Sequence, residues 1–226
     1  MGAAVEQEDH VSAEGQGWLE ERLGLRRVAR RVLARPVPEG VTWFHCFGGL
    51  TFFTFIVLVV TGIVLAFYYV PSPDHARASV AYIDSSLPFG SLVRNLHRWS
   101  AYAMIVLVFL HMVRVFVHGA YRKPRELSWV VGVLMLLLVL ALGFTGYLLP
   151  WDQKGYWATN VGINIAGSVP LVGPYLADLL RGGQQLGALT LLRFYALHVF
   201  VLPLLLGVGL VAHFAMIRKQ GISKPL

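Results

Sequence analysis

The chain has 226 residues, of which 56% are hydrophobic and 14% are charged, and its mean hydropathy is +0.62. Soluble domains usually carry about 25% charged residues, so this composition excludes an ordinary soluble protein. The formal net charge of +7 is attributed to membrane topology and anionic lipid rather than to nucleic acid.

The first 40 residues are polar and contain no apolar segment of the kind found in a cleavable signal. Residues 1–16 are acidic and are expected to be disordered. Residues 17–35 place leucine, valine and tryptophan among arginines, which predicts a basic amphipathic helix on the cytoplasmic surface. The alternative is a solvated tail. Pro36 and Pro38 end this segment, so we divide the chain into an extension, 1–40, and a membrane domain, 41–226.

Long runs without charged residues follow the extension. They occupy 41–73, 99–113, 127–151 and 194–217. With its apolar flanks, each run is long enough for a spanning helix of about 20 residues. The predicted spans are 43–69, 92–119, 127–149 and 191–217. The sequence therefore predicts an all-α membrane protein, a four-transmembrane-helix bundle.

A fifth uncharged run, 155–177, is interrupted by glycines and prolines. A spanning helix broken in this way would leave backbone groups unpaired in lipid. This run is predicted to form short surface helices between the third and fourth spans. Four spans put both termini on one side, which carries twelve basic residues against six on the other. The positive-inside rule places the termini in the cytoplasm or stroma.

Four histidines form two pairs inside the apolar segments. His97 and His111 are 14 residues apart, and His198 and His213 are 15 apart. At about 100° per residue each pair lies near one helix face, with its members roughly 21–22 Å apart along the axis. Two such helices side by side can form two stacked sites, each with two imidazoles. Imidazole pairs at membrane depth suit haem iron, which would carry electrons across a bilayer.

Two other readings of these histidines remain. A histidine in a spanning helix is often a satisfied interior residue, and a site for a bare transition metal usually adds carboxylate or cysteine, which neither histidine helix contains. The remaining histidines lie in the tail, at span ends or in a loop and are poor ligand candidates: His10, His45, His75 and His118.

Glycines repeat the same interval on the other two spans. Gly48 and Gly62 are 14 residues apart, as are Gly132 and Gly146. Missing side chains at two depths would let flat macrocycles lie against these helices. The alternative is ordinary small-residue helix packing.

Arginines lie near both histidine depths and are candidates for binding haem propionates, since a guanidinium pairs with a carboxylate through two hydrogen bonds. Their alternative role is to reach lipid headgroups. The outer candidates are Arg94, Arg98 and Arg193, and the inner candidates are Arg114 and Arg125.

Cys46 is the only cysteine, which excludes an intrachain disulfide. No CxxCH motif is present, so ordinary c-type haem attachment is not supported. From the residue itself, Cys46 is predicted to be a small, buried apolar side chain.

Eight motifs carry a resemblance to a known family. They are FHCFGGL (44–50), TGIVLAFYY (61–69), SLVRNLHRWSA (91–101), LHMVRVF (110–116), KPRELSW (123–129), GYLLPWDQKGYWA (146–158), LLRFYALHVFVLP (191–203) and HFAMIRKQGIS (213–223). Over about residues 40–226 the chain resembles cytochrome b6 and the N-terminal half of cytochrome b. The longer N-terminus departs from typical cytochrome b6.

The resemblance implies the cofactors and their ligands. His97 with His198 would bind the outer haem b, and His111 with His213 the inner haem b. Cys46 would form a thioether to a third haem that faces the inner quinone site, and Arg218 matches the arginine associated with that haem. Tyr147, Trp151, Asp152 and Tyr156 would border the outer quinol site.

The resemblance also implies the function. The chain would be the haem-binding core subunit of a quinol–cytochrome c/plastocyanin oxidoreductase, not catalytic alone, which couples electron transfer between an outer and an inner site to proton translocation. The sequence ends at Leu226 and lacks the Pro-Glu-Trp-Tyr motif of the quinol site. A subunit-IV-like partner is therefore expected, with a Rieske iron–sulfur protein and a cytochrome c- or f-type subunit.

The expected setting is a dimeric complex in a bacterial plasma membrane or a thylakoid. Two other functions remain as alternatives. One is a four-helix di-haem anchor of a hydrogenase or formate dehydrogenase. The other is a haem-free membrane scaffold or transporter.

Overall fold

The computed structural model describes Arg22, Gly24 and residues 42–221. The predictions for 1–16 and for the amphipathic helix at 17–35 lie outside the described residues, apart from Arg22 and Gly24. Within the described residues every regular element is helical. The predicted all-α class is confirmed.

Four helices are long and apolar enough to cross a membrane: Trp43–Ala66, Gly90–Val117, Glu126–Leu148 and Ala188–Gln220. They agree with the predicted spans to within a few residues. Only 11% of the apolar window of each span is buried inside the protein. Since an apolar surface of this extent is not stable in water, lipid must cover it.

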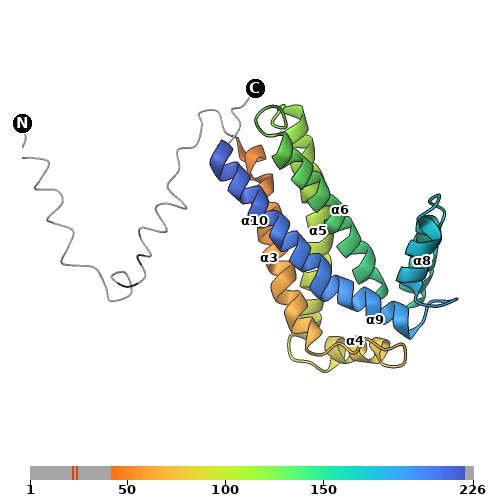
Figure 1. The fold of residues 1–226 in the computed structure, drawn as a ribbon. Coiled ribbons are helices and arrows are strands. Elements are labelled where there is room, and N and C mark those ends of the chain that lie inside the picture. Colours follow the sequence, from red (N-terminus) through yellow and green to blue (C-terminus); the bar gives the residue numbers. More distant parts are fainter. Residues whose placement is uncertain (1–21, 23, 25–41, 222–226) are drawn as a thin grey trace, which may run out of the picture. The chain divides into compact units, whose positions relative to one another are not determined.

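The first span begins with the 3₁₀ turn η1 (Trp43–Cys46) and continues as α3 (Phe47–Ala66). The second and third spans are α5 (Gly90–Val117) and α6 (Glu126–Leu148). Figure 1 shows the four spans as one bundle, in which α3 packs mainly on α5, and α6 mainly on the fourth span. Met104, Val108, Val139 and Leu206 form the buried core of the bundle.

The fourth span consists of α9 (Ala188–Ala196), the π-helical turn η2 (Leu197–Val201) and α10 (Leu202–Gln220). In the wide turn, the Leu202 N–H bonds to the Leu197 carbonyl. Pro203 follows directly, and a proline ring inside a helix crowds the carbonyl four residues before it. Widening of the preceding turn relieves that crowding, so His198 lies in a π-helical segment.

Three shorter helices lie outside the bundle: α4 (Ala76–Ser85), α7 (Gln153–Gly167) and α8 (Gly173–Arg181). The run 155–177 thus forms parts of two short helices and not a fifth span, as predicted. A second core joins these helices to α6 and α9 at one end of the bundle, and it includes Ala76, Ile163, Ala177 and Phe194.

Candidate functional site

The structure brings His97 of α5 and His198 of η2 together. Their ring centroids are 6.3 Å apart and their planes form an angle of 69°. Imidazole nitrogens bind metal ions at about 2 Å, so two rings at this separation can hold one ion between them. This is the pairing that the resemblance implied and that residue spacing alone left open.

His111 and His213 form the second pair, on α5 and α10, close enough to interact electrostatically. Among the described residues, no group of three or more His, Cys, Asp or Glu side chains is arranged to hold a metal ion. Each candidate site therefore offers two imidazoles. A metal held there must bring its other ligands with it, as haem iron does.

The imidazoles of the first pair are oriented by hydroxyl and carbonyl groups. The Nδ1 atom of His97 lies 2.8 Å from Thr61 Oγ1, and that of His198 lies 3.1 Å from the Leu142 carbonyl and 3.2 Å from Thr145 Oγ1. A ring whose Nδ1–H donates to an oxygen presents the lone pair of Nε2 to a metal. These contacts favour the tautomer that a ligand needs.

Sequence reasoning missed these orienting residues, although a signal was present. Both threonines precede a glycine of the repeated interval, in the dipeptides Thr61–Gly62 and Thr145–Gly146. In the second pair, Ser128 Oγ lies 3.3 Å from His213 Nδ1. Ser128 lies in no such dipeptide, so the sequence offered no comparable signal for it.

Each of the four spaced glycines faces one imidazole. A Cβ at Gly146 would lie 2.6 Å from His198 Cε1, and one at Gly48 would lie 3.0 Å from His111 Cε1. The corresponding distances are 3.3 Å from Gly62 to His97 and 3.9 Å from Gly132 to His213. The glycines of α3 thus face the histidines of α5, and those of α6 face the fourth span. In this structure the four glycines make space for the imidazole rings, whereas from the sequence we expected them to make space for the macrocycles.

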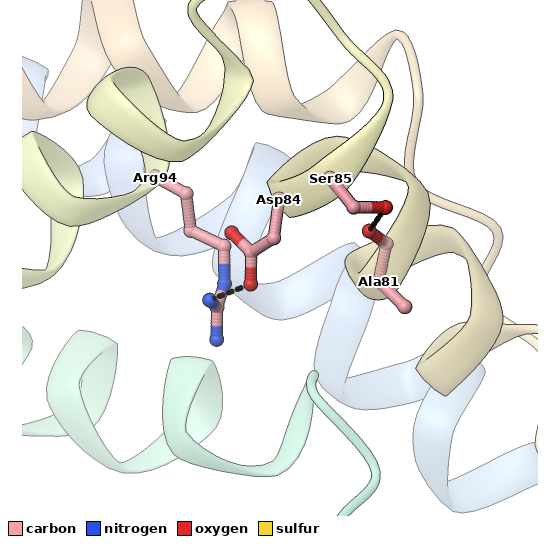
Figure 2. Close-up of polar contacts among 4 residues, drawn as sticks. All are labelled: Ala81, Asp84, Ser85 and Arg94. Carbon is pink, nitrogen blue, oxygen red and sulfur yellow. Dashed lines mark hydrogen bonds and ion pairs between the residues drawn. The ribbon is translucent and has the colours of Figure 1, made fainter.

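The three outer arginines all have protein partners. Arg94 forms an ion pair with Asp84 of α4, as Figure 2 shows. Arg98 Nε lies 3.4 Å from the Tyr102 hydroxyl. Arg193 donates to the carbonyls of Asp178 and Leu179 at the end of α8. The outer guanidinium groups therefore hold the surface helices and the start of α5.

The inner arginines differ. Arg114 Nε and Nη2 and Arg125 Nε are buried and have no hydrogen-bond partner among the described residues. Arg125 Nη2 is 3.4 Å from the Gln220 carbonyl. An unpaired buried guanidinium nitrogen is costly, so an anionic acceptor is expected beside it. The residues present therefore fit a metal cofactor that carries carboxylates, which haem does.

The bundle and its two histidine pairs define a membrane-spanning helical protein that binds metal cofactors between its helices. Comparison with known sequences identifies the family to which the chain belongs. A profile of the family described as cytochrome b/b6/petB matches residues 32–221. Cytochrome b6 of Oltmannsiellopsis viridis is 50% identical over 92% of this chain and 97% of its own length. Cytochrome b6 of Prochlorococcus marinus (strain MIT 9303) is 47% identical, over 92% and 96%.

A solved chain of a hyperthermophilic respiratory complex III is also similar, with a TM-score of 0.86 and 34% identity. The match covers 92% of this chain and 56% of the solved chain, so this chain spans just over half of that neighbour. The chain belongs to the cytochrome b/b6 family. It is a haem-binding core subunit of a quinol–cytochrome c/plastocyanin oxidoreductase and an integral membrane protein.

Proposed function

We propose that His97 and His198 hold the outer haem b, that His111 and His213 hold the inner haem b, and that the chain carries electrons between them across the membrane. The observation that carries the proposal is the pairing of His97 with His198 across two spans, with ring centroids 6.3 Å apart. Electrons would enter from quinol on the outer side and leave to quinone on the inner side, with proton release outside and uptake inside.

Haem supplies the one-electron chemistry, and the chain's own residues supply position and environment. Three of the histidines, His97, His198 and His213, would present Nε2, because their Nδ1 atoms face oxygen atoms. These oxygens belong to Thr61, Thr145, Leu142 and Ser128. The apolar core of α5, α6 and α10 excludes water between the two depths.

Replacement of one ligand at a time tests the assignment. In the purified complex, His198→Leu is expected to remove the outer haem and keep the inner one, and His213→Leu to do the reverse. His75→Leu is the control, since His75 is exposed before α4 and belongs to neither pair. Redox-resolved haem spectra distinguish the two sites. Retention of both haems in either ligand variant would contradict the assignment.

Cys46 is proposed to bind a third haem covalently, with Arg218 beside that haem. The thiol is exposed, and Cys46 lies two residues before Gly48, which faces His111. An accessible thiol at the start of the span that carries Gly48 supports the attachment. A pyridine haemochrome assay after acid–acetone extraction tests it. We expect one haem retained by the chain and none retained by Cys46→Ser; complete extraction from the unchanged chain would leave Cys46 as a packing residue.

Chains of this family act in cytochrome bc-type complexes with partner subunits. The proposed partners are a subunit-IV-like C-terminal half, a Rieske iron–sulfur protein and a cytochrome c- or f-type subunit, in a dimeric complex. The proposed topology has both termini on the cytoplasmic or stromal side, and the excess of basic residues on that side supports it. Co-purification of a Rieske-type protein would reject the hydrogenase or formate dehydrogenase anchor, and its absence would favour that anchor.

A further inference from the structure

The third and fourth spans pack along each other (Figure 1) and meet at a glycine that lies outside the repeated interval. A Cβ at Gly209 of α10 would lie 2.9 Å from Cγ and 3.2 Å from Sδ of Met135 on α6. At Gly207, a Cβ would meet nothing within 4 Å among the described residues. Since two residues are about 200° apart around an α-helix, Gly209 faces α6 and Gly207 faces away from it.

This contact adjoins the inner histidine pair. Gly209 precedes His213 by four residues, so the two lie about one turn apart along α10 and about 40° apart around it. On α6, Met135 follows Gly132 by three residues, and Gly132 is the glycine that faces His213. The two helices therefore make two successive contacts: His213 of α10 faces a glycine of α6, and Met135 of α6 faces a glycine of α10.

The two contacts have opposite senses, because the glycine belongs to α6 in one and to α10 in the other. A side chain that packs into the space opposite a glycine limits how far its helix can slide along the neighbouring helix. It also sets how closely the two backbones approach, since protein interiors are packed without spare volume. At the inner depth, the register and the spacing of α6 and α10 therefore depend on this pair of contacts.

His213 depends on helix spacing more than His198 does. The Nδ1 atom of His198 lies 3.1 Å from the Leu142 carbonyl and 3.2 Å from Thr145 Oγ1. The Nδ1 atom of His213 has one such oxygen, Ser128 Oγ, at 3.3 Å, and the glycine opposite its ring leaves an ordinary van der Waals distance of 3.9 Å. Because fewer direct contacts hold His213, its position follows that of α10.

We propose that Met135 and Gly209 position His213 for the inner haem, by setting the spacing of α6 and α10 one turn from that ligand. The inference rests on the proposed function, in which His213 is an axial ligand. Met135 is half-buried and packs against the bundle core that contains Met104 and Val139. Its side chain therefore cannot turn away from Gly209 without disturbing the core.

A methyl group at position 209 would push α10 away from α6 and carry His213 with it. A displaced imidazole is a weaker electron-pair donor to iron, which favours the reduced form of the haem and raises its midpoint potential. The outer ligands should be unaffected, because His198 lies eleven residues before Gly209 and has its own contacts with α6.

The test uses the whole complex with Gly209→Ala. Spectroelectrochemical titration measures both b-haem midpoints, and the low-spin EPR signal reports the mutual orientation of the two axial rings. We expect G209A to raise the midpoint of the inner haem, to change its EPR signal and to leave the outer haem unchanged. Gly207→Ala is the matched control: the substitution and the helix are the same, and alanine favours the helix at both positions, but a Cβ there meets no neighbour among the described residues.

A second substitution distinguishes positioning from general destabilisation of the bundle. Met135→Ala removes the atoms that the new methyl group would meet. In the G209A background it should restore the midpoint and the EPR signal of the inner haem. If G209A only destabilised the bundle, truncation of a second side chain at the core would add to the damage. Where G209A alone does not assemble, recovery of an assembled complex with an inner haem in G209A/M135A is the expected result.

Four results would overturn the inference. They are an unchanged inner midpoint and EPR signal in G209A, an equal shift in G207A, a shift of the outer haem instead of the inner one, and failure of M135A to restore the G209A complex. Each leaves the proposed function standing, because the unchanged complex still contains the inner haem. Absence of an inner haem from the unchanged complex would instead refute the proposed function.

Discussion

The imidazole of His198 rests on the backbone of α6 at Gly146. A Cβ at that glycine would lie 2.6 Å from Cε1 and 3.0 Å from Nδ1 of the ring. Distances this short are incompatible with a side chain, and the ring cannot retreat freely because its Nδ1 also bonds to the Leu142 carbonyl. The position of His198 therefore depends on the absence of a side chain on the neighbouring helix.

Gly146→Ala is expected to displace His198 and to abolish or strongly reduce outer-haem binding. The fourth span should still fold, because its core contacts at Leu202 and Leu206 are elsewhere. Gly143→Ala is the matched control on α6, since a Cβ there would lie 3.5 Å from Ile105 Cδ1, an ordinary contact. Haem per chain, measured by the haemochrome assay, should fall in the first variant and not in the second.

Gly132→Ala separates two roles for the glycines. A Cβ at Gly132 would lie 3.9 Å from His213 Cε1, which is ordinary van der Waals contact. If the glycines mainly accommodate imidazoles, this variant should keep its inner haem, whereas Gly48→Ala, at 3.0 Å from His111, should lose it. Equal loss of the inner haem in both variants would show that the glycines clear the macrocycle instead.

Thr61→Val is expected to raise the midpoint potential of the outer haem. The hydroxyl of Thr61 donates to the Val57 carbonyl at 2.7 Å, which leaves its oxygen to accept from His97 Nδ1 at 2.8 Å. When an oxygen accepts the Nδ1–H of a ligand histidine, the imidazole becomes a stronger electron-pair donor to iron. A stronger donor favours the oxidised form of the haem and lowers its midpoint potential. Thr54→Val is the control, because that buried hydroxyl bonds to the Leu50 carbonyl and to no histidine. An unchanged or lower potential in T61V would contradict this role.

Asp84→Asn tests the ion pair drawn in Figure 2. The two side chains are 29% and 35% exposed, so the pair should contribute no more than about 1 kcal/mol to stability. The larger effect is expected on the outer haem, because Arg94 lies three residues before His97 and loses the carboxylate that neutralises it. The outer midpoint should rise in D84N and stay constant in Asp74→Asn, an exposed aspartate of the same connection.

Tyr69 links the end of the first span to the end of α6. Its hydroxyl donates to the Leu149 carbonyl at 2.6 Å, and its ring stacks on Tyr195 at 5.6 Å. Burial, together with Tyr195, raises the pKa of Tyr69 above its usual value near 10. The folded state therefore favours the neutral phenol, and stability should fall as the pH rises above about 10.

Tyr69→Phe should lower the free energy of unfolding by about 1–3 kcal/mol at neutral pH, because the Leu149 carbonyl loses its donor. The variant should also lose part of the alkaline sensitivity. Thermal unfolding in detergent between pH 7 and 11 measures both effects. Tyr68→Phe, at the exposed neighbouring position, provides the reference. Equal alkaline slopes in Y69F and the unchanged chain would contradict the prediction.

The fold was predictable because its main determinant is the length of the uncharged runs. Lipid imposes about 20 apolar residues per span, and the four runs locate the four helices to within a few residues. The glycines and prolines of 155–177 were equally informative, since they identified the segment that could not span. The ends of the spans were less predictable, because the end of α3 at Ala66 and the start of α9 at Ala188 depend on local hydrogen bonds.

The candidate site was predictable in its histidines and glycines, whose intervals alone indicate common depths. The partners of the arginines were not. Arg94 and Asp84 are ten residues apart in sequence, and Arg193 reaches α8 across a Gly-rich turn; neither contact follows from helical periodicity.

The wide turn at Leu197–Val201 bears on the unequal intervals of the two histidine helices. A π turn takes up one residue more than an α turn before its hydrogen bond closes, so the 15 residues from His198 to His213 rotate through about the angle of 14 α-helical residues. The two imidazoles of the fourth span are thereby brought into phase with His97 and His111 on α5. Pro203 favours that turn, and the turn compensates for the one extra residue between His198 and His213. The two histidines of the fourth span therefore lie at the same depths and on the same side as the two histidines of α5.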